Sequence, residues 1–256
     1  MRIFIAGDMH GKLEWYQRID RYCRENNISE VRQVGDAGFF WPPDDDRCPI
    51  IKHFNTRNEG NPLWLAILGN HDNYNKFTKL KGSNHHSVSY AKDLIVLGRN
   101  FHYEHSLYLG GAVSSDAGPS TGIGPDGRVR NYKGRVEGKS WWRGEAPTHD
   151  ELQTFCDLLE TNKPRYVFTH DGPQFAHHAR GSEINPLSGL RTDEIARAFE
   201  TIWKISDHKP ERWFFGHHHE LTTVVEGPTS FHCCGLHGQG FVLDEEANTC
   251  KPVQVK

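Results

Sequence analysis

The chain of 256 residues is long enough to bury a substantial hydrophobic core. Its formal net charge of −3 argues against a protein that holds long nucleic acids or an anionic membrane mainly through charge. No apolar stretch approaches the length that spans a bilayer, and the cysteines form no C-x-x-C pair, which predicts reduced thiols rather than a disulfide framework. The cysteines are Cys23, Cys48, Cys156, Cys233, Cys234 and Cys250.

The first two predicted strands both end in polar residues. Residues 3–6 are apolar and stop at Gly7-Asp8-Met9-His10-Gly11, and residues 31–34 stop at Gly35-Asp36. Because the first run reaches these polar residues so early, we expect no signal peptide. Residues 12–27 between them predict a helix, because apolar side chains recur along one side of it. This order of strand, helix and strand predicts two parallel strands joined by a right-handed crossover. We expect Pro42-Pro43 and Asp44 to Asp46 to interrupt the pattern before a weak helix over residues 50–56.

The most apolar predicted strand covers residues 63–68, whose sequence is LWLAIL. A run this apolar indicates a strand that is buried on both faces of its sheet. Four residues without an obvious packing role follow it: Gly69, Asn70, His71 and Asp72. Catalytic and binding groups of open α/β sheets gather at such carboxyl ends, so we expect a functional site here.

The middle of the chain has weaker patterns. We expect an irregular polar loop over residues 73–89, and then short strands at 93–98, 102–104 and 107–111. Residues 114–146 form a long insertion rich in glycine and basic residues, and a loop of this length inside a compact domain is usually functional or disordered. Its basic side chains either contact phosphate or form a solvated surface, and its Trp141 and Trp142 either stack on a nucleobase or anchor the loop as buried indoles.

Regular structure resumes at residues 148–151, where Thr-His-Asp-Glu predicts a capping box at a helix start. Residues 166–169 predict a strand that ends at His170-Asp171, and residues 192–206 predict a helix with Ile195, Phe199, Ile202 and Ile205 facing inward. Residues 213–215 predict a strand that ends at Gly216-His217-His218-His219. We expect three or four strands over residues 221–255, at the antiparallel edge of a second sheet, and one domain over residues 1–256.

Five strand ends therefore carry side chains that bind metals. Asp8 and His10 are two residues apart, as are His217 and His219, and in extended backbone this spacing puts both members of a pair on one face. A mixture of carboxylate and imidazole suits manganese, iron, zinc or related divalent ions rather than soft thiolate chemistry. Seven candidate ligands are too many for one ion and fit two, with one carboxylate between them. The candidates are Asp8, His10, Asp36, Asn70, His170, His217 and His219.

The order D-x-H, G-D, G-N-H-D, H and G-H-x-H resembles the calcineurin-like metallophosphoesterase family over most of the chain. The resemblance implies an α/β sandwich of two central mixed β-sheets flanked by helices, with a dinuclear centre at the strand ends. It implies one ion held by Asp8, His10 and His219, a second ion held by Asn70, His170 and His217, and Asp36 bridging the two. It also places His71 beside the scissile phosphate as a catalytic residue, and lets Asp72, where relatives often carry Glu, orient a group of the active site.

The resemblance favours some branches of the family over others. Gly35 to Phe40 lacks the Asp and Arg that follow this motif in Ser/Thr protein phosphatases, while the pair His217 and His219 is similar to phosphodiesterases and nucleases. Gly110-Gly111-Ala112, Ser115-Asp116, Trp141-Trp142 and Glu145 resemble a smaller group of bacterial and phage members. We therefore expect a protein of the bacterial or phage-infected cytoplasm.

The function expected from the sequence is hydrolysis of phosphodiesters by a metal-bridging hydroxide, with two divalent cations as cofactors. Manganese is favoured, with iron, zinc, nickel or cobalt as alternatives. The expected substrates are small phosphodiesters or nucleotides such as cyclic nucleotides. Nucleic acid is less favoured, no membrane is expected, and the oligomeric state is left open. The alternatives are a phosphomonoesterase, a protein phosphatase or an exonuclease of the same fold, and a metal-bearing scaffold without catalysis.

Two further expectations concern residues outside the ligand set. His218 lies between two candidate ligands and is expected to point away from the metals. His177 and most of the remaining histidines are expected on the surface or in turns. Asp116 and Asp171 are expected to cap turns.

Overall fold

The computed structural model describes residues 1–39, 48–80, 86–123, 129–178 and 182–256, with the backbone alone at 78–80, 120–123 and 129–132. The interruption expected at Pro42-Pro43 and Asp44 to Asp46 lies outside the described residues. Within them, no helix is both long enough and apolar enough to cross a membrane.

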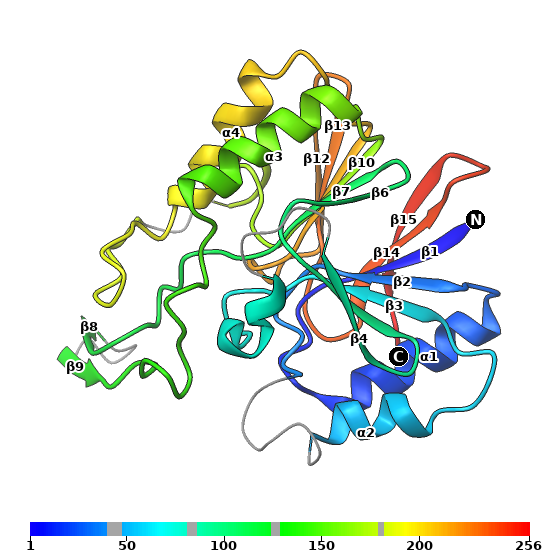
Figure 1. Ribbon diagram of the computed structural model, residues 1–256, viewed down its shortest axis with the longest axis horizontal. Helices are drawn as coiled ribbons and strands as arrows, with labels where there is room; N and C mark the ends of the chain where they lie inside the picture. Colours follow the sequence, from blue (N-terminus) through cyan, green and yellow to red (C-terminus); the bar gives the residue numbers. More distant parts are fainter. Residues whose placement is uncertain (40–47, 81–85, 124–128, 179–181) are drawn as a thin grey trace.

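Two mixed sheets form the centre of the molecule (Figure 1). In the described residues the first sheet has the strand order β15-β14-β1-β2-β3-β5-β4. Its strands β1, β2, β3 and β5 are parallel, as predicted for the first two, and β14, β15 and β4 are antiparallel to their neighbours. The strands are β1 (Arg2–Ala6), β2 (Glu30–Gln33), β3 (Leu63–Ala66), β4 (Ser87–Ala91), β5 (Leu94–Leu97), β14 (Gln239–Asp244) and β15 (Thr249–Gln254).

The second sheet has the order β12-β13-β11-β10-β7-β6 in the described part of the chain. Strands β13, β11, β10 and β7 are parallel, and β12 and β6 add antiparallel edges. The strands are β6 (Phe101–Tyr103), β7 (Ser106–Leu109), β10 (Tyr166–Thr169), β11 (Arg212–Phe215), β12 (Thr222–Glu226) and β13 (Thr229–Cys233). This confirms the predicted sandwich of two mixed sheets.

Helices cover the outer faces of both sheets (Figure 1). The first sheet carries α1 (Leu13–Glu25) and α2 (Pro49–Thr56), and the second carries α3 (His149–Asn162) and α4 (Glu194–Ile205). The predicted capping box starts α3: the Thr148 side chain accepts the N–H of Glu151, whose carboxylate accepts the N–H of Thr148. The described residues also contain two 3₁₀ segments, η2 (Tyr74–Leu80) and η3 (Gln174–Ala176).

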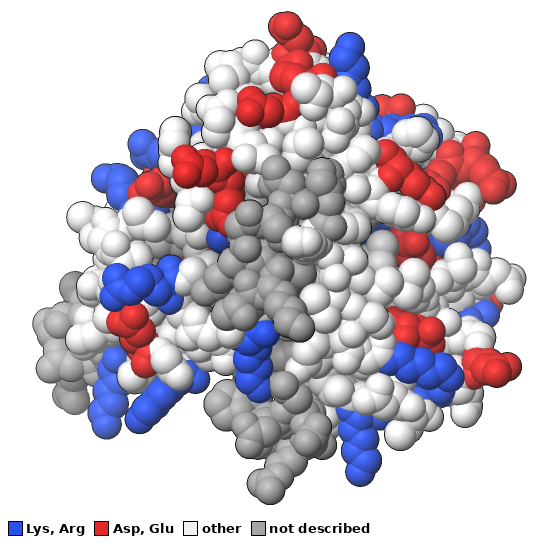
Figure 2. All heavy atoms as spheres, viewed as in Figure 1, with Lys and Arg blue, Asp and Glu red and all other residues white. Residues whose placement is uncertain are grey.

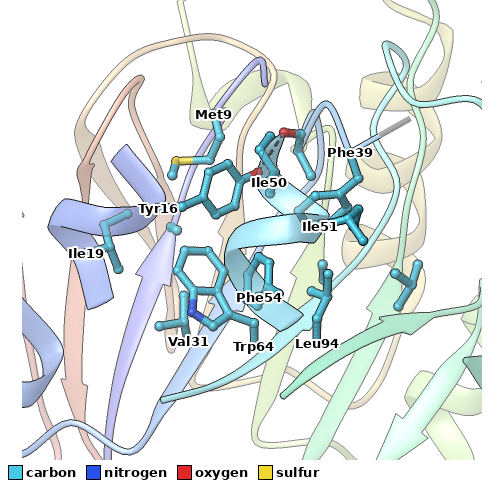
Figure 3. Close-up of a cluster of buried hydrophobic side chains, with 14 of the residues drawn as sticks. Met9, Tyr16, Ile19, Val31, Phe39, Ile50, Ile51, Phe54, Trp64 and Leu94 are labelled. Carbon is cyan, nitrogen blue, oxygen red and sulfur yellow. Dashed lines mark hydrogen bonds between the residues drawn. The ribbon is translucent and has the colours of Figure 1, made fainter. Parts of the chain in front are cut away.

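Three apolar clusters hold these layers together. The cluster between the first sheet and its helices centres on Tyr16, Phe54 and Trp64, whose rings contact one another (Figure 3). A second cluster lies under α3 and α4, and a third fills the space between the sheets. Burial of each such side chain contributes about 1.5–3 kcal/mol to the free energy of folding. Apolar runs in the sequence therefore mark the strands that the core buries.

Four expectations from the sequence need correction. Residues 73–89 are not wholly irregular, since they contain η2 and part of β4. The insertion contains a hairpin of β8 (Ser120–Ile123) and β9 (Val129–Tyr132). The strands after residue 221 divide between the sheets, since β12 and β13 join the second and β14 and β15 the first, and β13 is parallel to β11 rather than antiparallel. Ile205, predicted to face inward, is 67% exposed at the end of α4, and Trp203 is buried instead.

Candidate metal centre

The polar strand ends predicted from the sequence meet at one edge of the sandwich. Asp8 and His10 follow β1, and Asp36 follows β2. Asn70 and His71 follow β3, His170 follows β10, and the pair His217 and His219 follows β11. Five parallel strands from two sheets thus deliver their carboxyl ends to a common centre, as the fold class predicts.

A first group of side chains gathers around His219. Its Nε2 atom lies 3.0 Å from Nε2 of His10 and 3.0 Å from Oδ2 of Asp8. Asp8 is fully buried, and its Oδ2 atom has no hydrogen-bond donor of suitable geometry among the described residues. A buried carboxylate oxygen and two imidazole nitrogens that face one point are suited to hold a divalent cation.

A second group gathers around the side-chain oxygen of Asn70. This Oδ1 atom lies 2.9 Å from Nε2 of His170 and 3.1 Å from Nδ1 of His217. Nδ1 of His170 lies 2.8 Å from the carbonyl oxygen of Val34, which can only accept, so this nitrogen carries the proton. In the neutral imidazole, Nε2 therefore presents a lone pair toward the oxygen of Asn70. Two acceptors this close indicate a site for a cation between them.

Asp36 links the two groups. Its Oδ1 atom lies 3.4 Å from Nε2 of His170 and accepts the backbone N–H of His71 at 2.8 Å. Its Oδ2 atom lies 3.9 Å from Nε2 of His71, and Asp36, His71 and His10 also gather their ligand atoms within 4.8 Å. The position is the one that a carboxylate shared by two cations would need.

The charges at the centre favour a bound cation. Burial, together with Asp8 and Asp72, raises the pKa of Asp36 well above its ordinary value. Burial alone would raise the pKa of Asp8 as well, but nearby His219, His170 and His10 hold that pKa below its usual range. Carboxylates crowded in this way need positive charge beside them in order to stay ionised.

Two imidazoles of the centre, those of His10 and His71, are held in the neutral form. Burial lowers the pKa of His10 to about 4, although Asp8 opposes this shift. Burial, followed by Arg135 and the neighbouring histidines, lowers the pKa of His71 to about 2. The side chain of His71 is 24% exposed and that of His219 is 34% exposed, whereas Asp36 is buried, so solvent reaches the centre from the side of the two histidines.

The backbone at the centre adopts conformations that ordinary residues avoid. His10, Asp36, His217 and His219 all have positive φ, between 44° and 64°. Such conformations cost about 1 kcal/mol or more each and persist where the surroundings impose them, often at functional sites. A Cβ on Gly69 would lie 2.1 Å from Oδ1 of Asp36, so glycine is required there for the carboxylate to approach the strand end.

Asp72 is engaged by the backbone. Its Oδ2 atom accepts the N–H groups of Gly69 at 2.8 Å and Ala37 at 3.3 Å, and its Oδ1 atom accepts that of Gly38 at 2.9 Å. It therefore fastens the turn after β2, which carries Asp36, to the turn after β3. These contacts orient the centre through the main chain.

A separate group of Asp171, His177 and His218 lies beside the centre. His218 points to Asp171, with Nε2 2.8 Å from Oδ1, and this pair anchors the turn between His217 and His219. The rings of His177 and His218 stack with centroids 3.5 Å apart at 13°. The members of this group contact one another, and the group includes none of the ligands predicted from the sequence. His177 lies in the bend after η3 and is partly buried, which fits its expected place in a turn.

The insertion packs against the centre through residues that the sequence analysis did not connect with it. Trp141 and Trp142 are 0% and 2% exposed, so they anchor the insertion and are not surfaces for a base. The guanidinium of Arg135 donates hydrogen bonds to the side chains of Asp116 and Ser114 and to the carbonyl oxygens of Ser140 and Asn70. Asp116 thus pairs with Arg135 across the hairpin. Arg128 and the side chain of Arg130 lie outside the described part.

Comparisons with known proteins identify the family and the fold of the chain. A family model described as calcineurin-like phosphoesterase matches residues 1–221. Among solved structures, the chain is similar to TT1561 of Thermus thermophilus, with a TM-score of 0.58, 13% identity and coverage of 100% of this chain and 99% of that one. It is also similar to GAP50, the anchor in the inner membrane complex of Plasmodium, with a TM-score of 0.54, 12% identity and coverage of 100% and 89%. At such identities these likenesses show the fold alone. No curated protein matches the chain.

Proposed function

This chain belongs to the calcineurin-like phosphoesterase family of metal-dependent hydrolases, and we propose that it cleaves small phosphodiesters at the centre around Asp36. The observation that carries the proposal is the convergence of buried carboxylate oxygens, an amide oxygen and imidazole nitrogens on one centre. Oδ1 of Asn70 faces the lone pair of His170 at 2.9 Å, and Oδ2 of Asp8 is buried without a hydrogen bond among the described residues.

The ligand sets follow from the two groups of side chains. Asp8, His10 and His219 would hold one cation, Asn70, His170 and His217 would hold the other, and Asp36 would contact both. When bound, two divalent cations supply Lewis acidity toward a phosphoryl oxygen and lower the pKa of water. Manganese is our first choice, since carboxylate, amide oxygen and imidazole all suit it.

His71 would act on the substrate as a neutral imidazole. Its backbone N–H is fixed by Asp36 at 2.8 Å, and its ring is partly exposed on the side from which solvent reaches the centre. With a pKa lowered to about 2, the ring carries no charge at neutral pH. It can donate an N–H hydrogen bond to developing negative charge, and stabilisation of this kind contributes about 10²–10³ to turnover in other enzymes.

The charge around the centre favours diesters over monoesters. A diester carries one negative charge, whereas a monoester at neutral pH approaches two and benefits from an additional cationic side chain. Arg135 reaches the centre, but its donors are directed to Asp116, Asn70, Ser114 and Ser140 rather than to open space. Basic and acidic side chains are interspersed on the face in Figure 2, which fits a small substrate better than duplex nucleic acid.

The test compares turnover of bis-p-nitrophenyl phosphate and p-nitrophenyl phosphate by the full chain with Mn²⁺, and again with excess chelator. We expect a preference for the diester that chelation abolishes, and a panel of cyclic nucleotides would follow. A preference for the monoester would overturn the diester proposal in favour of a phosphatase. Turnover of neither ester with two metals bound would favour the scaffold, and cleavage of DNA ends would favour the exonuclease.

A further inference from the structure

We propose that Ser114 and Glu145 of the insertion are positioning residues that make Asn70 present its oxygen, rather than its nitrogen, to the metal centre. The inference rests on the proposed function, since it takes Asn70 as a metal ligand. The two ends of an amide have nearly the same shape, so packing alone does not choose between them. The hydrogen-bond network behind Asn70 does.

The side chain of Asn70 is buried between two sets of partners. Its Oδ1 atom faces His170 and His217, and its Nδ2 atom lies 2.8 Å from Oγ of Ser114. Asn70 is 2% exposed and Ser114 is fully buried, so water does not substitute for either partner. The hydroxyl of Ser114 is thus the group that Asn70 meets on the side away from the metals.

The hydroxyl of Ser114 has one hydrogen and two acceptor positions, and its other partners determine how they are used. Arg135 directs an Nη2 donor to this oxygen, and a guanidinium can only donate. The hydroxyl in turn donates to Oε2 of Glu145. Its single hydrogen is then used, so the remaining position accepts from Asn70, and the end of the amide that faces Ser114 is the NH₂ group.

Glu145 is fixed as an acceptor by a second set of donors. Its Oε1 atom accepts the backbone N–H of Ser114 at 2.9 Å and lies 3.2 Å from Nδ2 of Asn185. The amide of Asn185 is itself oriented, because its Oδ1 atom accepts the N–H groups of Leu187 and Ser188. Glu145 is 1% exposed, and its other oxygen lies 3.6 Å from Nη2 of Arg135.

The consequence appears at the opposite end of the Asn70 amide. With its nitrogen bound to Ser114, its oxygen faces Nε2 of His170, where both atoms offer electron pairs to a cation. If the amide turned over, its NH₂ group would donate to that imidazole and occupy the ligand position. Loss of an outer partner of this type lowers metal affinity about 10–100-fold in other proteins.

The decisive experiment titrates Mn²⁺ into chelator-treated full-length protein and follows free Mn²⁺ by electron paramagnetic resonance. Glu145→Gln keeps the shape of the side chain but lets an NH₂ group donate to Ser114, which would turn the amide of Asn70. Ser114→Ala removes the hydroxyl oxygen that accepts the hydrogen bond from Nδ2 of Asn70. Ser115→Ala, at the exposed neighbouring position, is the matched control. Thermal unfolding of the chelated proteins checks that each variant folds.

We expect one of the two Mn²⁺ sites to weaken at least about tenfold in Glu145→Gln and Ser114→Ala, with the other site and Ser115→Ala within about twofold of wild type. Equal weakening of both sites, or wild-type binding in Glu145→Gln, would overturn the inference. If Ser114→Ala does not fold, Glu145→Gln decides the question. A wild-type protein that binds two Mn²⁺ ions without diester turnover would overturn the proposed function alone, because this test measures binding.

Discussion

Nε2 of His10 lies 3.0 Å from Nε2 of His219, although 209 positions separate the two residues in the chain. Burial keeps His10 neutral at ordinary pH, with its pKa lowered to about 4, and Asp8 lies 3.0 Å from the same atom of His219. The packing of the two sheets therefore brings two imidazole nitrogens and a carboxylate oxygen to one point, because His10 and Asp8 follow β1 of the first sheet and His219 follows β11 of the second. A cation bound there would relieve the crowding of electron pairs.

The first prediction distinguishes a residue that binds both metals from a residue that binds only one. His219→Ala should cost one metal per chain, because His219 belongs to one group, whereas Asp36→Asn should lose both metals or leave one weakly held. Metal content after gel filtration, measured by elemental analysis, checks both variants. Full occupancy in Asp36→Asn would refute its bridging assignment.

The second prediction concerns His71. His71→Ala should keep the metal content of wild type and lower diester turnover about 10²-fold or more, because the ring contributes hydrogen bonding to the reacting phosphate. His178→Ala, which removes an exposed histidine paired with Glu220, should leave turnover unchanged. If His71→Ala turned over the diester at nearly the wild-type rate, the catalytic role proposed for His71 would be wrong.

The third prediction distinguishes positioning from direct catalysis at Asp72. Asp72→Asn replaces one carboxylate oxygen by a donor that faces a backbone N–H, so the turns that carry Asp36 and Asn70 should loosen. We expect the Mn²⁺ concentration for half-maximal turnover to rise about tenfold, with turnover at saturating Mn²⁺ within a few fold of wild type. Low turnover at saturating metal would instead make Asp72 a catalytic group.

The fourth prediction tests stability away from the centre. Asp20 is buried on α1, where its carboxylate lies 2.9 Å from Nη1 of Arg57, 2.9 Å from Nε2 of His53 and 2.9 Å from Nε1 of Trp64. Asp20→Ala should lower the free energy of unfolding by about 3–5 kcal/mol, because it removes the nearest counter-charge of the buried Arg57 and leaves it only the more exposed Asp93, whose Oδ2 lies 3.6 Å from Nη2. Glu25→Ala, at an exposed site on the same helix, should change it by about 0.5 kcal/mol or less. Urea unfolding measures both, and equal effects would contradict the prediction.

The fifth prediction concerns pH. His232 is buried and packs against Phe214 and Phe241 at centroid distances of 4.8 Å, and burial lowers its pKa to about 4. Between pH 6.5 and pH 4 the unfolded chain binds a proton at His232 that the folded chain does not, so stability falls as the pH falls through this window. His232→Phe should make the decrease in the free energy of unfolding between pH 7 and pH 4 smaller by about 3 kcal/mol. Denaturant unfolding of the chelated proteins at pH 7 and pH 4 checks the difference, which would be absent if His232 were already protonated in the fold.

Much of the fold was predictable because its signals are local. Short apolar runs that end in polar residues mark β1, β2, β3, β10 and β11, and a strand buried on both faces needs no information from elsewhere in the chain. The capping box before α3 is likewise read from four adjacent residues. The pair Asp8 and His10 does reach a shared point, but the extended backbone expected for such pairs is wrong, since His10, His217 and His219 all have positive φ.

The sequence by itself determined the strands, the side chains at their ends and the family whose motifs they resemble. The tertiary structure decided which sheet each late strand joins, the hairpin of the insertion, and the network that links Asn70 to Ser114 and Glu145, because these depend on pairing between distant segments. Asn70 and Ser114 are 44 positions apart, and Ser114 and Glu145 are 31 apart. A hydrogen bond across such a separation leaves no periodic pattern in the sequence, since its geometry is set by how the sheets and the insertion pack.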